Sequence, residues 1–212
     1  MTRLYNDPKE FADDALAGLV AAYPELLLQV YGGAVRATAS PPGEVAIVIG
    51  GGSGHYPAFA GWVGPGLAHG AACGNVFASP SAAQVYSVIR AADNGGGVLL
   101  TFGNYAGDVL HFGQAAERAR AEGMDIRILP VTDDIASAPP EKPEMRRGTA
   151  GDLVVFKVAA AAAERGADLD EVERIARHAN ARTRSFGVAF DGCTLPGSDA
   201  PLFTVPSGLM SV

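Results

Sequence analysis

Two glycine-rich runs in the sequence each lead to a side chain that can exchange a proton. Residues 50–54 precede His55, and residues 103–107 precede Asp108. Each run directly follows an apolar segment typical of a buried strand, 45–49 and 98–102 respectively. Because loops at the carboxyl ends of parallel strands meet at one edge of an open α/β sheet, we expect His55 and Asp108 to face one small ligand.

The first glycine run matches neither of the common nucleotide-binding signatures. It lacks the Gly-x-Gly-x-x-Gly spacing of a dinucleotide fingerprint, and no Lys-Ser or Lys-Thr pair follows it as in a Walker A loop. Consecutive glycines still allow backbone N–H groups to approach a ligand, since no Cβ stands in the way. The run is therefore either a ligand-binding loop or a tight turn, and an ordinary nucleotide-binding protein is the weaker hypothesis.

Both ionisable side chains have a structural as well as a chemical interpretation. His55 either caps its own loop or hydrogen-bonds a substrate hydroxyl, and a neutral imidazole near pH 7 suits a sugar-like substrate. Asp108 either caps the helix that follows it or takes a proton from a substrate hydroxyl. The two roles of Asp108 are compatible.

The remaining polar candidates carry weaker patterns. We favour solvated or capping roles over a metal site for Asp133 and Asp134, because no third ligand stands at a recognisable spacing. The pair Arg146-Arg147 either binds a phosphate or partner, or is simply solvated. We expect structural, surface or packing roles for four further residues: His69, His111, His178 and Trp62.

Composition limits the classes of partner. The chain has 212 residues, 48% of them hydrophobic, and a net charge of −7, which argues against nucleic acid or an anionic membrane as the main partner. Cys73 and Cys193 are lone thiols without metal-ligand spacing. The first eight residues do not resemble a signal peptide, and no apolar stretch reaches a membrane-spanning length, so we expect a cytoplasmic protein.

The order of the expected elements predicts an α/β layered sandwich with a mainly parallel sheet flanked by helices. Apolar runs predict strands at 45–49, 98–102, 126–131 and 186–190. Helical spacing and end signals predict helices at about 8–23, 79–94, 112–122, 149–165 and 168–179.

Finer features of the expected fold follow from local signals. Asp7 and Pro8 resemble an N-cap and a first helical residue, and Thr149 with Asp152 resembles a capping box. Residues 56–74 resemble a loop around a short element. We assign 1–190 to one α/β domain and 191–212 to the start of a second subdomain that is cut short.

The motifs of the chain, taken in order, resemble the substrate-binding domain of dihydroxyacetone kinases. Each motif is weak alone, but the set is highly specific and runs through essentially the whole chain. The motifs are Gly50-Gly51-Gly52-Ser53-Gly54-His55-x-Pro57 with Gly61, Gly64 and Gly66, then Asn104-Tyr105-x-Gly107-Asp108, Asp133-Asp134-x-Ala136, Arg146-Arg147-Gly148-x-Ala150-Gly151, Ala163-Glu164-Arg165-Gly166 and Cys193-Thr194-x-Pro196.

The resemblance implies the substrate-binding part of an enzyme that phosphorylates the terminal hydroxyl of dihydroxyacetone or a related short ketose. By motif, Gly52, Ser53 and Gly54 line the substrate loop. His55 hydrogen-bonds the substrate and assists proton transfer, and Asp108 acts as acid and base on the reacting hydroxyl.

The resemblance also implies that this domain itself binds no cofactor. A separate helical, nucleotide-binding domain or subunit carries the phosphoryl donor, either as ATP with magnesium or as a nucleotide recharged by a phosphotransferase chain. The family resemblance further implies a homodimer and a role in glycerol metabolism.

The chain departs from the family pattern in two places. The family often has a lysine where this chain has Gly103, so we expect a larger pocket that admits a four-carbon ketose such as erythrulose. The family's other histidine, which bonds covalently to the substrate carbonyl, belongs to a segment expected shortly after Val212. We therefore expect the isolated 212-residue chain to be inactive, and the alternative function is a non-catalytic ketose-binding or regulatory relative.

Overall fold

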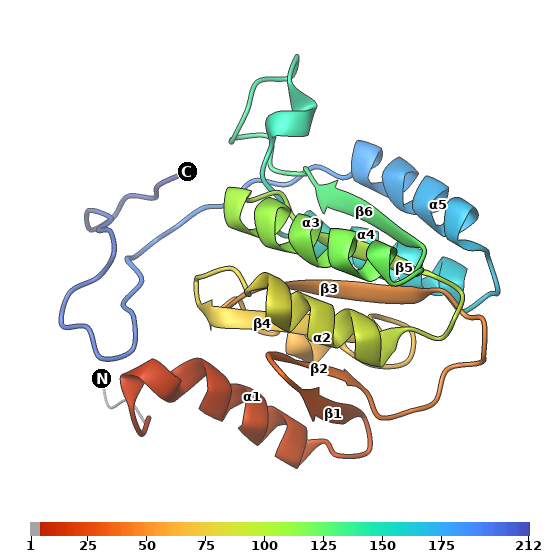
Figure 1. Cartoon of the computed structure of the whole chain (residues 1–212). Coiled ribbons are helices and arrows are strands. Elements are labelled where there is room, and N and C mark those ends of the chain that lie inside the picture. Colours follow the sequence, from red (N-terminus) through yellow and green to blue (C-terminus); the bar gives the residue numbers. More distant parts are fainter. Residues whose placement is uncertain (1–4) are drawn as a thin grey trace.

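The sheet has six strands in the order β1-β2-β4-β3-β5-β6 (Figure 1). The computed structural model describes residues 5–212. The strands are β1 (Leu27–Val30), β2 (Gly33–Arg36), β3 (Ala46–Ser53), β4 (Gly70–Val76), β5 (Val98–Gly103) and β6 (Ile126–Val131). Strands β4, β3, β5 and β6 are parallel, and the antiparallel hairpin β1-β2 extends the sheet beyond β4. The predicted mainly parallel sheet is thereby confirmed.

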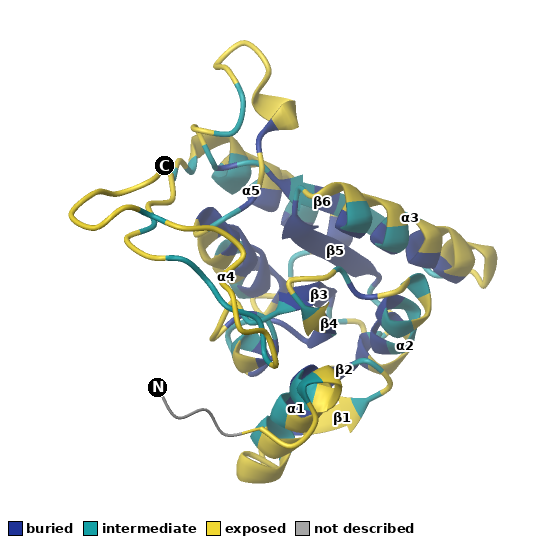
Figure 2. Ribbon diagram, turned by 90° about the vertical axis from the view of Figure 1, so that its left-hand side faces the viewer, coloured by how far each residue is buried: buried dark blue, intermediate teal, exposed yellow. Residues whose placement is uncertain are grey.

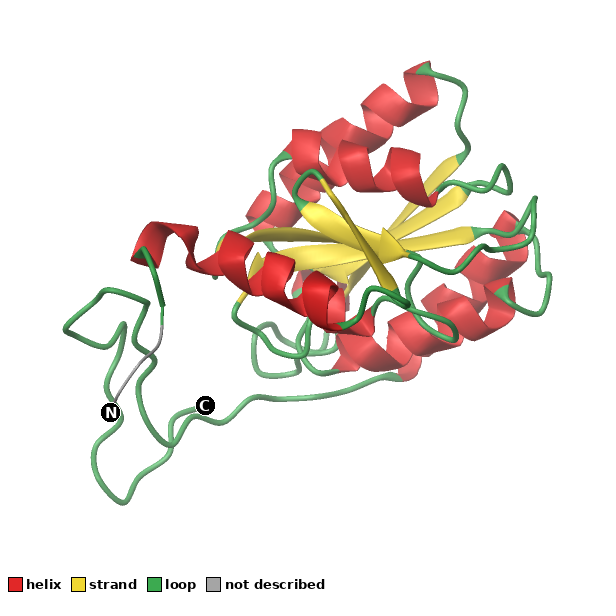
Figure 3. Cartoon of the chain, turned by 90° about the horizontal axis from the view of Figure 1, so that it is seen from below, coloured by secondary structure: helices red, strands yellow, loops and turns green. Residues whose placement is uncertain are grey.

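Helices cover both faces of this sheet, as Figure 3 shows from below. The α-helices are α1 (Phe11–Ala22), α2 (Ala82–Ala92), α3 (Ala106–Ala121), α4 (Gly151–Ala163) and α5 (Leu169–Arg182), and the 3-10 turns are η1 (Pro8–Glu10), η2 (Ala60–Trp62) and η3 (Pro143–Met145). Helices α2 and α3 pack on one face, and α4 and α5 pack on the other. Asp7 accepts a hydrogen bond from the Lys9 N–H, which confirms its predicted capping role.

The side chains of β3 point alternately into two hydrophobic clusters, one on each face of the sheet. Ala46 and Val48 join the cluster beneath α2 and α3, whereas Ile47 and Ile49 join the cluster beneath α4 and α5. A parallel strand covered on both faces is a continuous apolar run, and for this reason 45–49 was recognisable in the sequence. The same holds for β5 and β6, and Figure 2 shows the central strands as buried.

The predicted strand at 186–190 is wrong. The segment is a loop whose alternating apolar side chains Phe186, Val188 and Phe190 are 61%, 43% and 69% exposed. A strand needs a ladder of hydrogen bonds to a neighbour, and here only isolated bridges form, between Asp134 and Ser185 and between Ala189 and Ser211. Alternation alone therefore gave a strand pattern without a partner strand.

The prediction of a loop through 56–74 is also wrong at its end, because β4 begins at Gly70. Four of the seven residues of this strand are glycine or alanine, which carry little strand signal. A Cβ on Gly70 would lie 2.7 Å from Cγ1 of Val88 in α2, so close helix packing requires a residue without a side chain. The short hairpin strands β1 and β2 were not predicted either.

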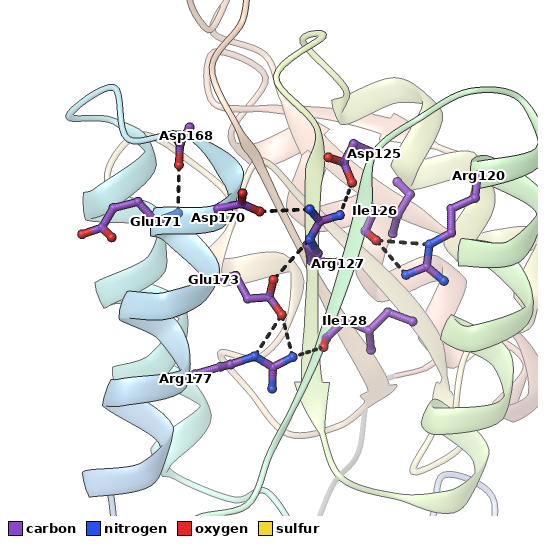
Figure 4. A network of polar contacts seen from close by, with 10 residues as sticks. All are labelled: Arg120, Asp125, Ile126, Arg127, Ile128, Asp168, Asp170, Glu171, Glu173 and Arg177. Atoms are coloured by element: carbon purple, nitrogen blue, oxygen red, sulfur yellow. Dashed lines mark hydrogen bonds and ion pairs between the residues drawn. The ribbon is translucent and has the colours of Figure 1, made fainter.

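A polar network attaches α5 to the edge strand β6 (Figure 4). Arg127 of β6 reaches Asp170 at 2.9 Å and Glu173 at 3.2 Å. Asp168 accepts a hydrogen bond from the Glu171 N–H at 2.9 Å, so the predicted start of this helix is confirmed. Arg127 is 34% exposed, so each of these ion pairs contributes little stability, and α5 is held mainly by the buried side chains Leu169, Val172 and Ala176.

Both ends of the described chain lie outside the sheet. Residues 1–4, part of the segment that does not resemble a signal peptide, lie outside the described residues. Within 5–212, none of the helices combines the length and apolar character needed to cross a bilayer. After α5 the chain continues as a long loop to Val212 (Figure 1), and the assignment of 191–212 to a second subdomain stays a prediction.

Candidate functional site

A cleft of about 820 Å³ opens at the carboxyl ends of β3 and β5. From β3 the chain continues into β4 on one side, whereas β5 is followed by β6 on the other side. The connections thus diverge between β3 and β5, which is where open α/β sheets bind ligands. The lining residues come from five segments: 50–52, 54–59 with Trp62, 77–79, 103–108 and 148–152. The cleft brings His55 and Asp108 together, as their positions after neighbouring strands predicted.

Glycines form the part of the cleft wall contributed by β3. A Cβ on Gly52 would lie 2.7 Å from the backbone nitrogen of Ala78, a contact that no side chain could make without moving the backbone. Gly54 has φ +100°, a conformation that side chains strongly disfavour. The glycine run therefore lets the chain turn at the cleft and places no side chain there.

His55 lines the cleft directly after the glycine run, and one of its ring nitrogens makes a hydrogen bond within the loop. Its Nδ1 lies 2.8 Å from the carbonyl oxygen of Gly52. Because a carbonyl only accepts, Nδ1 carries the proton in the neutral ring, and Nε2 is left with a lone pair that can accept from a hydroxyl. The rings of Phe77 and Phe59 meet the imidazole edge-on, with centroids at 5.0 and 6.3 Å. Capping of its own loop and availability to a ligand are thus combined in one residue.

Ser53 differs from its neighbours in the glycine run. Its hydroxyl donates to the carbonyl oxygen of Gly74 at 2.7 Å, which ties the end of β3 to β4. Gly52 and Gly54 line the cleft, but Ser53 is not among the lining residues. Its contribution to the site is through the backbone position of its neighbours.

Asp108 lies in the first turn of α3 and is only 6% exposed. The N-cap of α3 is Tyr105, so the prediction that Asp108 caps this helix is wrong because the helix begins two residues earlier. Its Oδ1 makes no hydrogen bond with a described residue. Burial raises the pKa of Asp108, and this is only partly opposed by the Ser79 hydroxyl and by His111 and His55. A carboxylate with a raised pKa is a stronger base, as proton abstraction from a hydroxyl requires.

Asp152, which the sequence analysis assigned to a capping box, is a second acidic residue of the cleft. The capping box is absent: the N-cap of α4 is Ala150, without a side-chain cap. The Thr149 hydroxyl instead donates to Oδ2 of Asp133 at 3.1 Å. The only sequence signal for a site residue was an acidic side chain in the first turn of an otherwise largely apolar helix.

Asp133 holds the start of α4 in place. It is fully buried and accepts hydrogen bonds from the N–H groups of Thr149 and Gly151 at 2.9 and 2.8 Å, and from the Ser185 hydroxyl. Burial alone would raise the pKa of Asp133, but the hydrogen bonds from these three residues together lower it. Asp134 accepts from the Ala136 N–H at 2.9 Å, so both acidic residues have local capping roles.

The two arginines after η3 behave differently. Arg146 is buried and Arg147 is exposed, so the interpretation of a solvated pair is wrong for Arg146. The guanidinium of Arg147 lies 6.0 Å from the ring centroid of Tyr105, a residue that lines the cleft. Asn104 donates to the carbonyl oxygens of Arg146 at 2.8 Å and Glu144 at 3.0 Å, which joins this loop to the end of β5.

The other candidate residues have the structural roles expected of them. The Nδ1 of His69 accepts from the Ile47 N–H at 3.1 Å, and His111 bonds the carbonyl of Pro80 at 2.7 Å through Nδ1. Trp62 packs edge-on against Phe59 and Phe156 beside the site loop, and His178 is exposed on α5. Cys73 and Cys193 are both free thiols.

Comparison with known proteins adds information that geometry alone does not carry. The Dak1 domain family matches residues 17–212. An L-erythrulose 1-kinase of Mycolicibacterium smegmatis is 67% identical over the whole chain, which covers 37% of that protein. The dihydroxyacetone-binding subunit DhaK of PTS-dependent dihydroxyacetone kinase 2 from Listeria innocua is 45% identical, and the chain covers 64% of it.

A solved structure is similar in fold. The dihydroxyacetone kinase of C. freundii, in complex with AMP-PNP and Mg²⁺, superimposes with a TM-score of 0.86 at 38% identity. The match covers 97% of this chain and 39% of the C. freundii chain. The chain thus spans less than two thirds of the length of each of these proteins.

Proposed function

The chain belongs to the Dak1 domain family, and on this premise we propose that it is the substrate-binding domain of a kinase acting on the terminal hydroxyl of a short ketose. Erythrulose is the favoured substrate and dihydroxyacetone the second. This order is supported by the relatives, because the one named for L-erythrulose shares more of its residues with this chain than the dihydroxyacetone-binding subunit does.

The observation that carries this proposal is the pairing of Asp108 and His55 in one cleft. Oδ1 of Asp108 has no hydrogen-bond partner among residues 5–212, and the hydrogen bond of His55 to Gly52 uses Nδ1 and leaves Nε2 for a ligand. A ketose offers several hydroxyls around a carbonyl, so it can donate to both groups at once. Gly52 and Gly54 line the cleft without a Cβ and complete the binding surface.

In the proposed reaction Asp108 is the general base. The O–H bond of the terminal hydroxyl breaks as its proton passes to the Asp108 carboxylate, and the hydroxyl oxygen forms the new bond to phosphorus. The leaving group of the phosphoryl donor departs with the electron pair of the broken bond. His55 accepts a hydrogen bond through Nε2, orients the ketose for this attack and assists the proton transfer.

The phosphoryl donor is assigned to a separate helical nucleotide-binding domain or subunit, either as ATP with magnesium or as a donor recharged by a phosphotransferase chain. The C. freundii enzyme, solved in complex with AMP-PNP and Mg²⁺, supports the first alternative, and the PTS-dependent kinase of Listeria innocua supports the second. Within 5–212 no group of three His, Cys, Asp or Glu side chains is arranged to hold a metal ion. A homodimer, a cytoplasmic location and a role in glycerol metabolism belong to the same proposal.

The proposal is tested by measuring ketose phosphorylation by the intact protein with its donor. The His55→Ala variant should lower kcat/KM for erythrulose about 10²- to 10⁴-fold while its melting temperature stays close to that of the wild type. His178→Ala, which changes an exposed histidine on α5, is the matched control and should have no effect. Unchanged turnover in His55→Ala would remove this residue from the site. Ketose binding without any turnover in the wild type would support the non-catalytic alternative.

A further inference from the structure

Asp152 is a buried carboxyl group that the proposed reaction does not use. It lies in the first turn of α4, is 5% exposed, and belongs to the lining of the cleft. Its Oδ1 makes no hydrogen bond with any residue in the range 5–212. Burying a polar group without a partner costs free energy, and such groups in native proteins call for a functional or structural reason.

Two glycines pack closely against this carboxyl group. A Cβ on Gly103 would lie 3.2 Å from Oδ2 of Asp152, and a Cβ on Gly148 would lie 2.6 Å from its Oδ1. Any other residue at these two positions would crowd or cover the carboxyl. Both glycines also line the cleft. The Asn104 side chain donates to the carbonyl oxygens of Glu144 and Arg146, which holds the loop before Gly148 against the end of β5.

The surroundings also set the charge state of the group. Burial raises the pKa of Asp152 well above its usual value, and the negative charges of Asp133 and Asp108 raise it further. These effects favour the neutral acid. A neutral carboxylic acid both donates and accepts a hydrogen bond, which matches the hydroxyl of a sugar better than a carboxylate does.

We propose that Asp152, which lines the cleft beside Gly103 and Gly148, binds a substrate hydroxyl that is not phosphorylated and thereby selects a four-carbon over a three-carbon ketose. Dihydroxyacetone has one hydroxyl besides the reacting one, whereas erythrulose has two. With Asp108 and His55 at the reacting end, the additional hydroxyl needs a partner on another wall, and Asp152 supplies it from α4. This inference rests on the proposed function, since it assigns a residue to the specificity of that reaction.

The test compares kcat/KM for erythrulose and dihydroxyacetone in the intact protein. Asp152→Ala should lower the value for erythrulose about 10- to 100-fold, as expected for the loss of one buried hydrogen bond to substrate, and that for dihydroxyacetone less than about 3-fold. Asp152→Asn should retain most of the preference for erythrulose, because an amide also donates and accepts. Asp13→Ala, which removes an exposed acidic side chain from the first turn of α1, is the control and should leave both values unchanged.

A second variant changes the surroundings of Asp152 without changing its carboxyl group. Gly103→Ala should place a methyl group 3.2 Å from Oδ2 of Asp152. This variant should lower kcat/KM for erythrulose more than kcat/KM for dihydroxyacetone. An equal loss on both ketoses, or no loss in either Asp152→Ala or Gly103→Ala, would overturn the specificity role while the kinase function stands. A wild-type protein that phosphorylates dihydroxyacetone but not erythrulose would overturn it in the same way. A wild-type protein that phosphorylates neither ketose would overturn the proposed function and this inference together.

Discussion

Replacement of Asp108 by asparagine separates its chemical role from its structural one. Asparagine has nearly the same shape but cannot take a proton from a hydroxyl. A missing general base costs about 10²- to 10⁴-fold in rate, which corresponds to about 2.7–5.4 kcal/mol in the activation free energy. We therefore expect Asp108→Asn to lower kcat for ketose phosphorylation by this factor, with a much smaller change in KM.

The same substitution should change stability little. The carboxylate near the start of α3 gains about 0.3–1 kcal/mol from the helix dipole, and asparagine loses that interaction. Against this, asparagine removes a carboxyl group whose pKa is raised by burial, which means that its ionised form is disfavoured in the fold. The two effects oppose each other, so the free energy of unfolding should stay within about 1 kcal/mol of the wild type.

The pH dependence of kcat/KM provides an independent measurement. The base must be ionised to act, so activity should rise with pH through the pKa of Asp108, and the raised pKa places this rise above the usual range of an aspartate near about 3.9. Asp108→Asn should lose this acid limb. Glu117→Gln, which neutralises an exposed carboxylate on the same helix, should keep both the rate and the limb. A near-normal kcat in a folded Asp108→Asn protein would refute the assignment of the base.

Two further predictions concern the fold that supports the cleft. Asp133→Ala should destabilise the protein by roughly 2–4 kcal/mol, because the N–H groups at the start of α4 and the Ser185 hydroxyl lose their acceptor. Urea unfolding measures this change in the free energy of unfolding. A loss below about 0.5 kcal/mol would contradict the prediction. The pKa of Asp133 is lowered in the fold, so its carboxylate contributes fully to the free energy of unfolding above the unfolded pKa of about 3.9. This contribution is lost as the pH falls through the lowered pKa. On acidification below about pH 4, Asp133→Ala should therefore lose less stability than the wild type. Burial raises the pKa of the Cys73 thiol to about 12, so iodoacetamide at pH 8 should leave Cys73 unmodified in the native state; rapid alkylation there would show that the β4 region opens readily.

Much of the fold was predictable because its central strands are buried on both faces. The continuous apolar runs of β3 and β5 are typical of strands covered on both faces, and the order of these strands placed His55 near Asp108. Strand β4 was missed because close packing against α2 requires small residues there, and small residues carry no strand signal. The segment 186–190 was overpredicted because alternation does not show whether a neighbouring strand exists.

The candidate site was predictable to the extent that it follows strand ends. Asp152 could not be found in this way, because it reaches the cleft from a helix and its local sequence resembles a cap. What distinguishes it is burial in the cleft lining together with the close approach of Gly103 and Gly148, and both depend on loops brought together by the fold. Likewise, Asp108 resembled an N-cap until the start of α3 was known.

A crystal structure of the intact protein with bound erythrulose tests the central claim most directly. We expect the ketose in the cleft between the ends of β3 and β5, with a terminal hydroxyl within about 3.0 Å of the Asp108 carboxyl and a second oxygen within hydrogen-bond distance of Nε2 of His55. Erythrulose bound elsewhere on the protein, with this cleft empty, would contradict the account.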